Sequence, residues 1–567
     1  VVNVDTGTLL KSTLADLVIG SATNLNVSGT QNLTITADVD FKNSTSPVGS
    51  AIDGTIDASG LSGKLNITPN AADNMQITGG SANDTIIMGL GLNAYDKVAG
   101  GGGSDTVTMT TAAVTGAGVL QSYALSGLSG VETIELTSSA AAGGINMTGL
   151  NADVSTVVLK SASKTVTVTG TIDTPGEDLA FTLNGVTTAI ATAVGVNTAA
   201  EMGAILKTTI DGLAGFSAAA GGTADIIVIT NDAGGVVEFT SLVNTTDPTD
   251  LIAFTDVYLA NAVTGLPNDG SKTVDIRQGE TVAVSLADPS GAADVATVRL
   301  STSAADKSLK QSINTLTVVA TETLNIETTG RTNTIDTVVE TITADASLTK
   351  LVLTGESDLD LTGTITAGKL VTIDASGATG DVATDVPAVT TAGSTVTGGT
   401  GADNFIFGSG LNYLDTVVGG EGKDKLSATV SGFSGALSAA GTLNVTGVET
   451  LNLTATLSTD INAAGITGAT QISFTGAQAG ITKLTNLEAG TNVGFGTYKT
   501  DGASTGRTDI ALADATGTAD AIGIVLNDTA GGNTNNIELR ASGIETANIS
   551  FGYESSLDTA LANHVLD

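Results

Sequence analysis

The 567-residue sequence contains no cysteine, no tryptophan, one histidine and only 21 lysines and arginines. The missing cysteines exclude disulfide bonds, which many extracellular chains use. Because His564 is the only histidine, zinc sites built on several histidines, such as the HExxH motif, are excluded. No apolar run reaches the ~18 residues of a membrane-spanning helix. No signal segment precedes Val1, so we expect either a removed start or export without an N-terminal signal.

Basic residues are scarce relative to acidic ones. Asp and Glu number 58, which gives a formal net charge of −37 and a pI near 4.1. Nucleic acid is excluded as a partner, because its recognition requires a basic surface. Many carboxylates lack a protein counter-charge, which favours cations as partners, although solubility alone is a sufficient reason for any single exposed acid.

Short apolar-polar-apolar triplets recur throughout the chain between Gly, Ser, Asn and Thr. Examples are LNV at 25–27, LNI at 65–67, LNI at 324–326 and LNL at 451–453. Alternation of period two in such short pieces predicts strands joined by tight turns, stacked as solenoid coils or as a sandwich.

Longer phrases show that one module occurs twice. TIDASGLSG at 55–63 returns as TIDASGATG at 372–380, and GVETIEL at 130–136 returns as GVETLNL at 447–453, with GIETANI at 543–549 as a third version. The fold class that we predict is mainly β, with β-solenoid or β-roll-like repeat modules in two copies and a small inserted α+β domain. The predicted domains are a first module at 1–172, the insert at 173–300, a second module at 301–495, and a C-terminal β segment with a terminal helix at 496–567.

The predicted insert has its own local signals. Residues 178–190 read as a hairpin with Asn184-Gly185 at its turn. Thr198 and Glu201 form a capping box before a helix, in which Met202, Ile205, Leu206 and Ile210 keep helical spacing. We interpret this domain as a spacer or lattice contact, with a binding function as the alternative.

Each module carries a block of nonapeptides of the form G-G-x-G-x-D-x-U-x, where U is apolar. The blocks span 79–108 and 398–427, a constant 319 positions apart. Full matches are GGGGSDTVT at 100–108, GGTGADNFI at 398–406 and GGEGKDKLS at 419–427. GGSANDTII at 79–87 has alanine at the third glycine position, whereas GLNAYDKVA at 91–99 and GLNYLDTVV at 410–418 are degenerate.

The pattern suits a calcium-binding turn. Glycines permit positive φ and let backbone carbonyls converge, the aspartate adds an anionic oxygen, and the apolar residue begins an inward-facing strand. Ca²⁺ takes six to eight oxygens, which two stacked turns can supply. We therefore predict that Asp84 pairs with Asp105 and Asp403 with Asp424, while Asp96 and Asp415 lie at the opposite edge. The predicted metal-site residues are Gly79, Asn83, Asp84, Asp96, Gly100, Gly101, Gly103, Asp105, Gly398, Gly399, Gly401, Asp403, Asp415, Gly419, Gly420, Gly422 and Asp424. A metal-free solenoid with Gly and Asp as simple turn formers is the alternative.

The nonapeptides resemble the RTX calcium-binding β-roll. Together with the long Thr/Ser/Asn-rich β repeats, they make the chain similar to RTX-type surface-layer (S-layer) proteins of Gram-negative bacteria. The resemblance implies a secreted structural protein that leaves the cell by type I secretion, binds Ca²⁺, and self-assembles into a lattice at the extracellular cell surface. Lipopolysaccharide or another surface glycan is the anchoring partner that it suggests, although the sequence shows no obvious anchor.

Two other functional classes are open to a chain with such turns. A secreted RTX adhesin would bind a surface or glycan ligand, and a secreted enzyme would carry a separate catalytic domain. GASTG at 502–506 formally matches G-x-S-x-G, but no strand–turn–helix pattern surrounds Ser504. We therefore expect no enzymatic activity. The segment 553–567 reads as a terminal helix, or as part of an uncleaved secretion signal.

Overall fold

A computed structural model describes most of residues 1–552. The residues left out of the description are 8–11, 16, 20–22, 42–51, 71–72, 90–91, 111–118, 121–124, 138–142, 149, 151–152, 161–162, 171–177, 192–197, 222, 232–236, 238, 246–252, 258–259, 278–280, 302–310, 331–336, 389–392, 430–441, 455–459, 476–480, 496–506, 517–519, 528–537, 543 and 553–567. Among the described residues, no helix combines the length and apolar character needed to cross a membrane.

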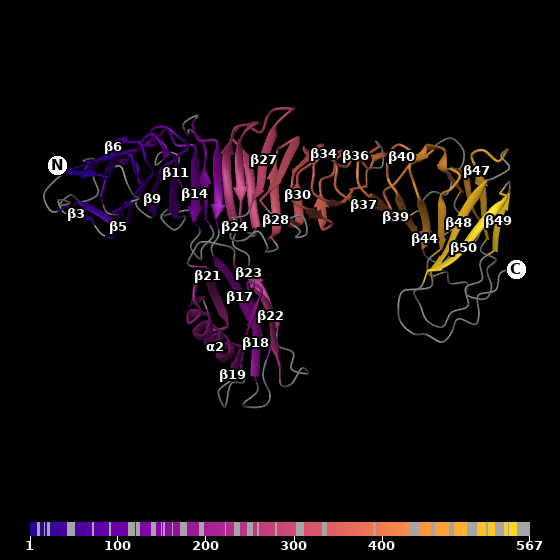
Figure 1. Cartoon of the computed structure of the whole chain (residues 1–567), viewed down its shortest axis with the longest axis horizontal. Helices are drawn as coiled ribbons and strands as arrows, with labels where there is room; N and C mark the ends of the chain where they lie inside the picture. The colour runs from indigo at the N-terminus through magenta and orange to yellow at the C-terminus, as the bar shows by residue number, and fades with distance from the viewer. Residues whose placement is uncertain are drawn as a thin grey trace. The chain divides into compact units, whose positions relative to one another are not determined.

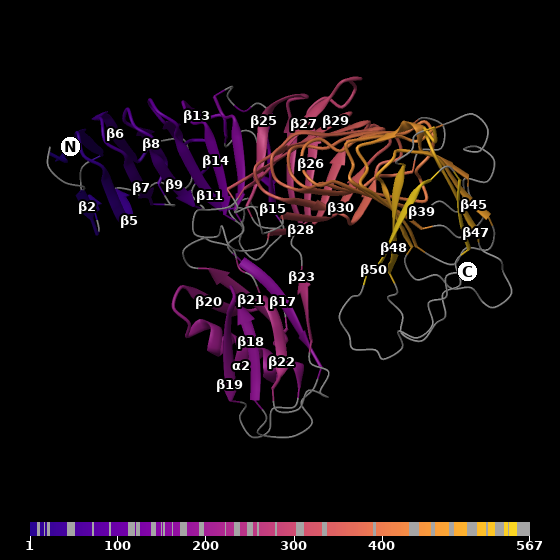
Figure 2. The same cartoon turned by 45° about the vertical axis from the view of Figure 1, so that its right-hand side comes forward.

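The chain is mainly β, and its parallel strands stack as a β-solenoid of about 16 turns, which confirms the predicted fold class. It divides into two compact units. Unit 1 comprises 1–321 and 329–335, and unit 2 comprises 322–328 and 336–567. Figures 1 and 2 show how the strands within each unit lie side by side, coil after coil.

In unit 1 every coil adds a strand to a parallel sheet. The first sheet runs β1 (Val2–Asp5), β4 (Asn24–Gly29), β6 (Gly54–Leu61), β8 (Met75–Thr78), β10 (Lys97–Ala99) and β13 (Leu128–Ser129). The second contains β2 (Ser12–Leu14), β3 (Leu17–Ile19), β5 (Leu33–Phe41), β7 (Leu65–Pro69), β9 (Thr85–Gly89), β11 (Thr106–Thr110), β14 (Thr133–Thr137), β16 (Thr156–Lys160), β25 (Asp269–Ile276) and β27 (Val295–Ser301). The third contains β12 (Val119–Leu120), β15 (Gly143–Asn146), β24 (Ala260–Leu266), β26 (Thr281–Leu286) and β28 (Gln311–Val319).

Branched apolar residues form the core of unit 1 as a continuous ladder. In the second sheet, the paired positions that face inward are Ile67, Ile86, Val107, Ile134, Val157, Val274 and Val298, all buried. In each strand a partly exposed Thr or Asn precedes the inward residue, so a coil buries its apolar face only by stacking on the next coil.

Unit 2 repeats this architecture. One parallel sheet contains β29 (Thr323–Thr329), β31 (Lys350–Gly355), β34 (Thr372–Ala378), β36 (Thr395–Thr397), β38 (Thr416–Val418), β40 (Asn444–Thr446) and β43 (Ile466–Thr467). Another contains β30 (Thr337–Ala344), β32 (Leu359–Leu361), β33 (Thr364–Thr366), β35 (Val382–Asp385), β37 (Asn404–Gly408), β39 (Lys425–Thr429), β41 (Thr450–Thr454), β44 (Gln471–Thr475), β46 (Asn492–Phe495), β48 (Ala521–Asn527) and β50 (Thr546–Gly552). A third contains β42 (Asp460–Asn462), β45 (Ile481–Leu487), β47 (Arg507–Leu512) and β49 (Glu538–Ser542), and the 3₁₀ turn η2 spans Ala463–Gly465.

An antiparallel α+β domain interrupts the coils of unit 1. Its strands are β17 (Ser163–Thr169), β18 (Asp178–Leu183), β19 (Val186–Ala191), β20 (Phe216–Ala220), β21 (Ile226–Asn231), β22 (Phe239–Asn244) and β23 (Ala253–Val257). Helix α2 (Ala199–Asp211) packs on β20, β21 and β17 (Figure 2). Phe181 stacks on Phe239, whose ring meets Phe254 edge-on at 4.8 Å, so the domain has an aromatic core of its own.

The local signals predicted for the insert are confirmed, but its boundaries are not 173–300. Asn184 and Gly185 both adopt positive φ in the β18–β19 turn, and the Thr198–Glu201 capping box is formed. However, β17 already belongs to the inserted domain, while β24 to β27 belong to the solenoid. Because β15 pairs with β24 and β16 with β25, the coils continue across the insert, a long-range pairing that local periodicity does not reveal.

Candidate metal site

The candidate site is the column of turns that precedes β7, β9 and β11 in unit 1, and β35, β37 and β39 in unit 2. Gly101, Gly103, Gly420 and Gly422 adopt φ between +104° and +120°, a conformation that L side chains rarely adopt. The turns also approach one another closely. A Cβ added to Gly100 would lie 1.9 Å from the Gly130 carbonyl oxygen and 2.5 Å from Asp105 Oδ2.

The aspartates of stacked turns in unit 1 are linked through their backbone. Asp84 Oδ1 accepts the Leu65 N–H at 2.8 Å, and Asp105 Oδ1 accepts the Asp84 N–H at 2.7 Å. One coil further, Glu132 Oε2 accepts the Asp105 N–H at 2.7 Å. Each carboxylate therefore caps the turn of the preceding coil, and we call Asp84, Asp105 and Glu132 the carboxylate ladder of unit 1.

Unit 2 contains the same ladder, made of Asp403, Asp424 and Glu449. Asp403 Oδ1 accepts the Val382 N–H at 2.8 Å, and Asp424 Oδ1 accepts the Asp403 N–H at 2.8 Å. Glu449 Oε2 accepts the Asp424 N–H at 2.7 Å. Because the two copies differ in sequence yet share every bond of the ladder, this geometry follows from the common turn pattern.

The second carboxylate oxygens divide the aspartates into two classes. Asp84 Oδ2 accepts the Gly80 N–H at 2.6 Å, and Asp403 Oδ2 accepts the Gly399 N–H at 2.7 Å. Asp105 Oδ2 and Asp424 Oδ2 are buried and accept no hydrogen bond.

The two classes of aspartate differ in the backbone conformation of the glycine four residues earlier. This residue is Gly101 for Asp105 and Gly420 for Asp424, and both have positive φ, whereas Gly80 and Gly399 do not. The N–H of Gly101 or Gly420 does not bond the carboxylate, so the last nonapeptide of each block retains a buried anionic oxygen without a donor.

Asp96 and Asp415 lie in other sheets, before β10 and β38. Asp96 accepts the Met75 N–H at 2.7 Å and the Asn93 N–H at 2.8 Å. Asp415 accepts the Ser394 and Asn412 N–H groups, both at 2.6 Å. Both oxygens of each carboxylate are thus used by backbone donors, which is the behaviour of a turn former.

Burial dominates the electrostatics of all six aspartates. It raises the pKa of each of them, against the lowering effect of the backbone N–H donors. The pKa reaches about 6 for Asp105, Asp403 and Asp424, where neighbouring carboxylates add to the rise. Across the described part of the chain, no lysine or arginine forms an ion pair with any of these six residues. Their negative charge is therefore not compensated by described basic side chains.

The remaining predicted residues also lie in these turns. Asn83 Oδ1 accepts the Ser104 N–H at 3.0 Å. Gly79, Gly398 and Gly419 each lie against the carbonyl oxygen of the next coil, and Gly399 and Gly401 against that of the preceding coil. Within the described residues, no three acidic, histidine or cysteine side chains gather into a metal-binding group. The oxygens available to a metal ion in these turns come instead from carboxylates and backbone carbonyl groups, both of which are calcium ligands.

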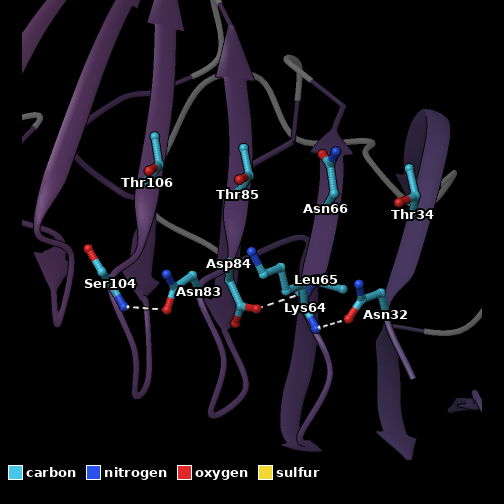
Figure 3. A pocket seen from close by; sticks show the side chains of 10 residues that line it. All are labelled: Asn32, Thr34, Lys64, Leu65, Asn66, Asn83, Asp84, Thr85, Ser104 and Thr106. Atoms are coloured by element: carbon cyan, nitrogen blue, oxygen red, sulfur yellow. Dashed lines mark hydrogen bonds between the residues drawn. The ribbon is translucent and has the colours of Figure 1, made fainter. Parts of the chain in front are cut away.

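An open groove of about 460 Å³ borders the turn column of unit 1. Figure 3 shows Asn66, Thr85 and Thr106 in a row on neighbouring strands, with Lys64 below them and Asp84 bonded to the Leu65 N–H. Seven of the ten lining residues carry an amide or a hydroxyl group, and Lys64 and Asp84 add a charge each, so the groove offers hydrogen bonds rather than an apolar pocket.

Glu132 and Glu449 were missed as members of the site. They stand in the repeated GVET phrase, whose recurrence after each nonapeptide block indicated strands only. GASTG at 502–506, His564 and the segment 553–567 lie outside the described residues, as does Gly91 of a degenerate nonapeptide. Comparison with known proteins gives no match, either to a protein-family model or to a curated protein.

Proposed function

We propose that the chain is a structural protein of a bacterial surface layer, which binds Ca²⁺ through its nonapeptide turns, folds outside the cell and self-assembles into a lattice. The observation that carries the calcium site is the pair of carboxylate ladders, whose aspartates are buried and which have no ion-pair partner among the described basic residues. Uncompensated buried carboxylates destabilise a fold when they are ionised. A hard dication ligated by oxygen removes that penalty.

The residues that would hold calcium are the aspartates of stacked turns, Asp84 with Asp105 and Asp403 with Asp424. Next to Gly79, Asp84 Oδ2 and the Gly100 carbonyl oxygen converge, and Asp403 Oδ2 and the Gly419 carbonyl oxygen converge in the same way next to Gly398. The bound ion would supply positive charge and draw two coils together. Its binding free energy would then be folding free energy, which keeps the chain unfolded where calcium is scarce.

Regular outward faces support the assembly part of the proposal. In unit 2, Thr372, Thr395 and Thr416 are paired on adjacent strands and point away from the core. Such a repeated polar face suits contacts between identical copies, whose symmetry decides between closed rings and extended sheets.

The test is far-ultraviolet circular dichroism and electron microscopy of the full chain with millimolar calcium and with chelator. We expect calcium to induce β structure and then ordered sheets or tubes, which chelator dissolves. β structure that is indifferent to calcium would refute the calcium site and leave the aspartates as turn formers. Calcium-dependent folding without ordered assembly would refute the lattice.

A second candidate function, a secreted adhesin for a glycan, is favoured by the polar groove beside Asp84. Sugars are held by amide and hydroxyl groups, and Asn66, Thr85 and Thr106 present these on a rigid sheet. Binding of a lipopolysaccharide or of another surface polysaccharide that is lost in Asn66→Ala, in protein that does not assemble, would support this function over the lattice.

A further inference from the structure

The GVET turn completes a cation site that the nonapeptide pattern does not encode. The proposed function places calcium between the first and the last nonapeptide turn of each block. We propose a second site one coil further, formed by Asp105, Glu132 and the Gly130 carbonyl oxygen in unit 1, and by Asp424, Glu449 and the Gly447 carbonyl oxygen in unit 2. This inference rests on the proposed function, because it concerns the same ion.

The first observation is the buried oxygen without a donor. Asp105 and Asp424 are each only 1% exposed, and the Oδ2 atom of each has no hydrogen-bond partner. A buried ionised oxygen without a hydrogen-bond donor destabilises the fold more than a buried neutral acceptor without one. The same atom is satisfied in Asp84 and Asp403, so among the nonapeptide aspartates the missing donor is confined to the last nonapeptide of each block.

The second observation is what this oxygen faces. The point where a Cβ of Gly100 would stand lies 2.5 Å from Asp105 Oδ2 and 1.9 Å from the Gly130 carbonyl oxygen. At Gly419 the corresponding distances are 2.4 Å to Asp424 Oδ2 and 1.8 Å to the Gly447 carbonyl oxygen. Two oxygens from different coils thus converge on the face of a glycine, which carries no side chain of its own.

The third observation is the glutamate. Glu132 and Glu449 each use Oε2 to accept the N–H of the aspartate. Two carboxylates are thereby held together with a carbonyl oxygen, in two independent copies. Hard anionic and carbonyl oxygens are the ligands that Ca²⁺ prefers, and water can complete the coordination.

A purely structural role for the glutamate has a clear comparison in the chain. Glu545 Oε2 accepts the Asp520 N–H at 2.9 Å, and the Asp520 carbonyl oxygen accepts the Glu545 and Thr546 N–H groups. This turn occurs without a nonapeptide before it, yet Asp520 Oδ2 is also buried and has no hydrogen-bond partner. The glutamate cap and the oxygen without a donor can therefore occur together outside the nonapeptides. A cap and a ligand must therefore be separated by an experiment that counts ions.

The experiment uses the full chain, freed of metal by chelator and then titrated with CaCl₂, with bound ions counted by equilibrium dialysis. We expect Glu132→Gln to remove one bound ion, or to weaken it at least tenfold, and Glu132→Gln with Glu449→Gln to affect two. Glutamine can still accept the aspartate N–H, so the cap remains while the charge is lost. The matched control is Glu421→Gln, which removes an exposed charge from a nonapeptide of unit 2 and should leave the count unchanged.

A second readout covers variants with altered stability. The calcium midpoint of folding, followed by circular dichroism, should rise at least tenfold in the double variant relative to Glu421→Gln. If the ion count and midpoint equal those of the control, the glutamates are only caps and the inference is overturned, while the nonapeptide sites stand. If the unmodified chain binds no calcium at all, the proposed function itself fails.

Discussion

At the residue scale, the aspartates of the nonapeptides are distinguished by what their second oxygen contacts. Asp84 and Asp403 accept a backbone N–H group with Oδ2, whereas Asp105 and Asp424 keep a buried Oδ2 free of donors. The sequence predicts which residue types converge in these turns. It does not predict this division, because GGGGSD and GGTGAD match the same pattern while Gly101 and Gly399 differ in φ.

Close approach of coils makes Gly79, Gly100, Gly398 and Gly419, the first glycines of the four nonapeptides that are not degenerate, intolerant of a side chain. In Gly100→Ala the new Cβ would overlap the Gly130 carbonyl oxygen and crowd Asp105 Oδ2. We expect a loss of about 1–3 kcal/mol in the free energy of unfolding, measured by urea denaturation at fixed calcium. Gly102→Ala is the matched control. Its Cβ would come no closer than 3.8 Å to any atom beyond the neighbouring residues of the chain, and the change should alter stability by less than about 0.5 kcal/mol. Equal losses in both variants would contradict the close approach.

The raised aspartate pKa values predict an inverted pH dependence in chelator. Asp105, Asp403 and Asp424 have a folded-state pKa of about 6, above the unfolded value of about 3.9. Between these two values the folded state binds more protons, so the free energy of unfolding falls as pH rises from about 4 to about 6. Above the folded-state pKa, these aspartates are ionised and destabilise the folded chain to the full extent.

Thermal melts between pH 4 and pH 7.5 without calcium measure this slope. Asp105→Asn combined with Asp424→Asn should flatten it, whereas Glu421→Gln should not. Calcium at pH 7.5 should restore the stability lost on deprotonation. A stability that rises from pH 4 to pH 6 would show that these carboxylates are favourably paired in the folded chain.

At the scale of elements, strand and helix formation follows local chemistry closely. Period-two triplets such as 25–27, 65–67 and 451–453 lie in β4, β7 and β41. The start of helix α2 was predicted from Thr198 and Glu201 and is confirmed. Capping and alternation are interactions among near neighbours in sequence, which is why they can be read without a tertiary structure.

The capping box offers a test at this scale. Thr198→Ala removes the acceptor of the Glu201 N–H and should destabilise α2 by about 1 kcal/mol. Hydrogen exchange of the first-turn amides of α2 measures the change. Thr208→Ala is the control, because its hydroxyl only donates to the Ala204 carbonyl within the helix, and alanine is a better helix former. Faster exchange in the control than in Thr198→Ala would argue against the cap.

At the scale of the whole molecule, the coils of unit 1 form one continuous set despite the insert. The inward ladder continues from Val157 of β16 to Val274 of β25 in register, and both residues are buried. The α+β domain has its own core. Coil stacking therefore does not depend on the residues between 160 and 260.

This independence predicts that the insert can be removed. We expect replacement of 161–259 by a five-residue linker, the spacing between β14 and β15, to leave calcium-dependent β structure and the ion count unchanged. Circular dichroism and equilibrium dialysis check both. Assembly followed by electron microscopy then shows whether the domain makes lattice contacts. Loss of the calcium-induced fold would mean that the insert is part of the folding unit.

The sequence by itself determined the repeated β architecture, the turn chemistry and the hairpin and helix start of the insert. These features depend on residue type and spacing within one coil. Only the tertiary structure decided that β24 to β27 rejoin the coils, that Glu132 and Glu449 complete the carboxylate ladders, and that Asp105 and Asp424 keep a free oxygen. The reason is that a contact between coils depends on stacking register and on the direction of single N–H groups, which residues distant in sequence determine together.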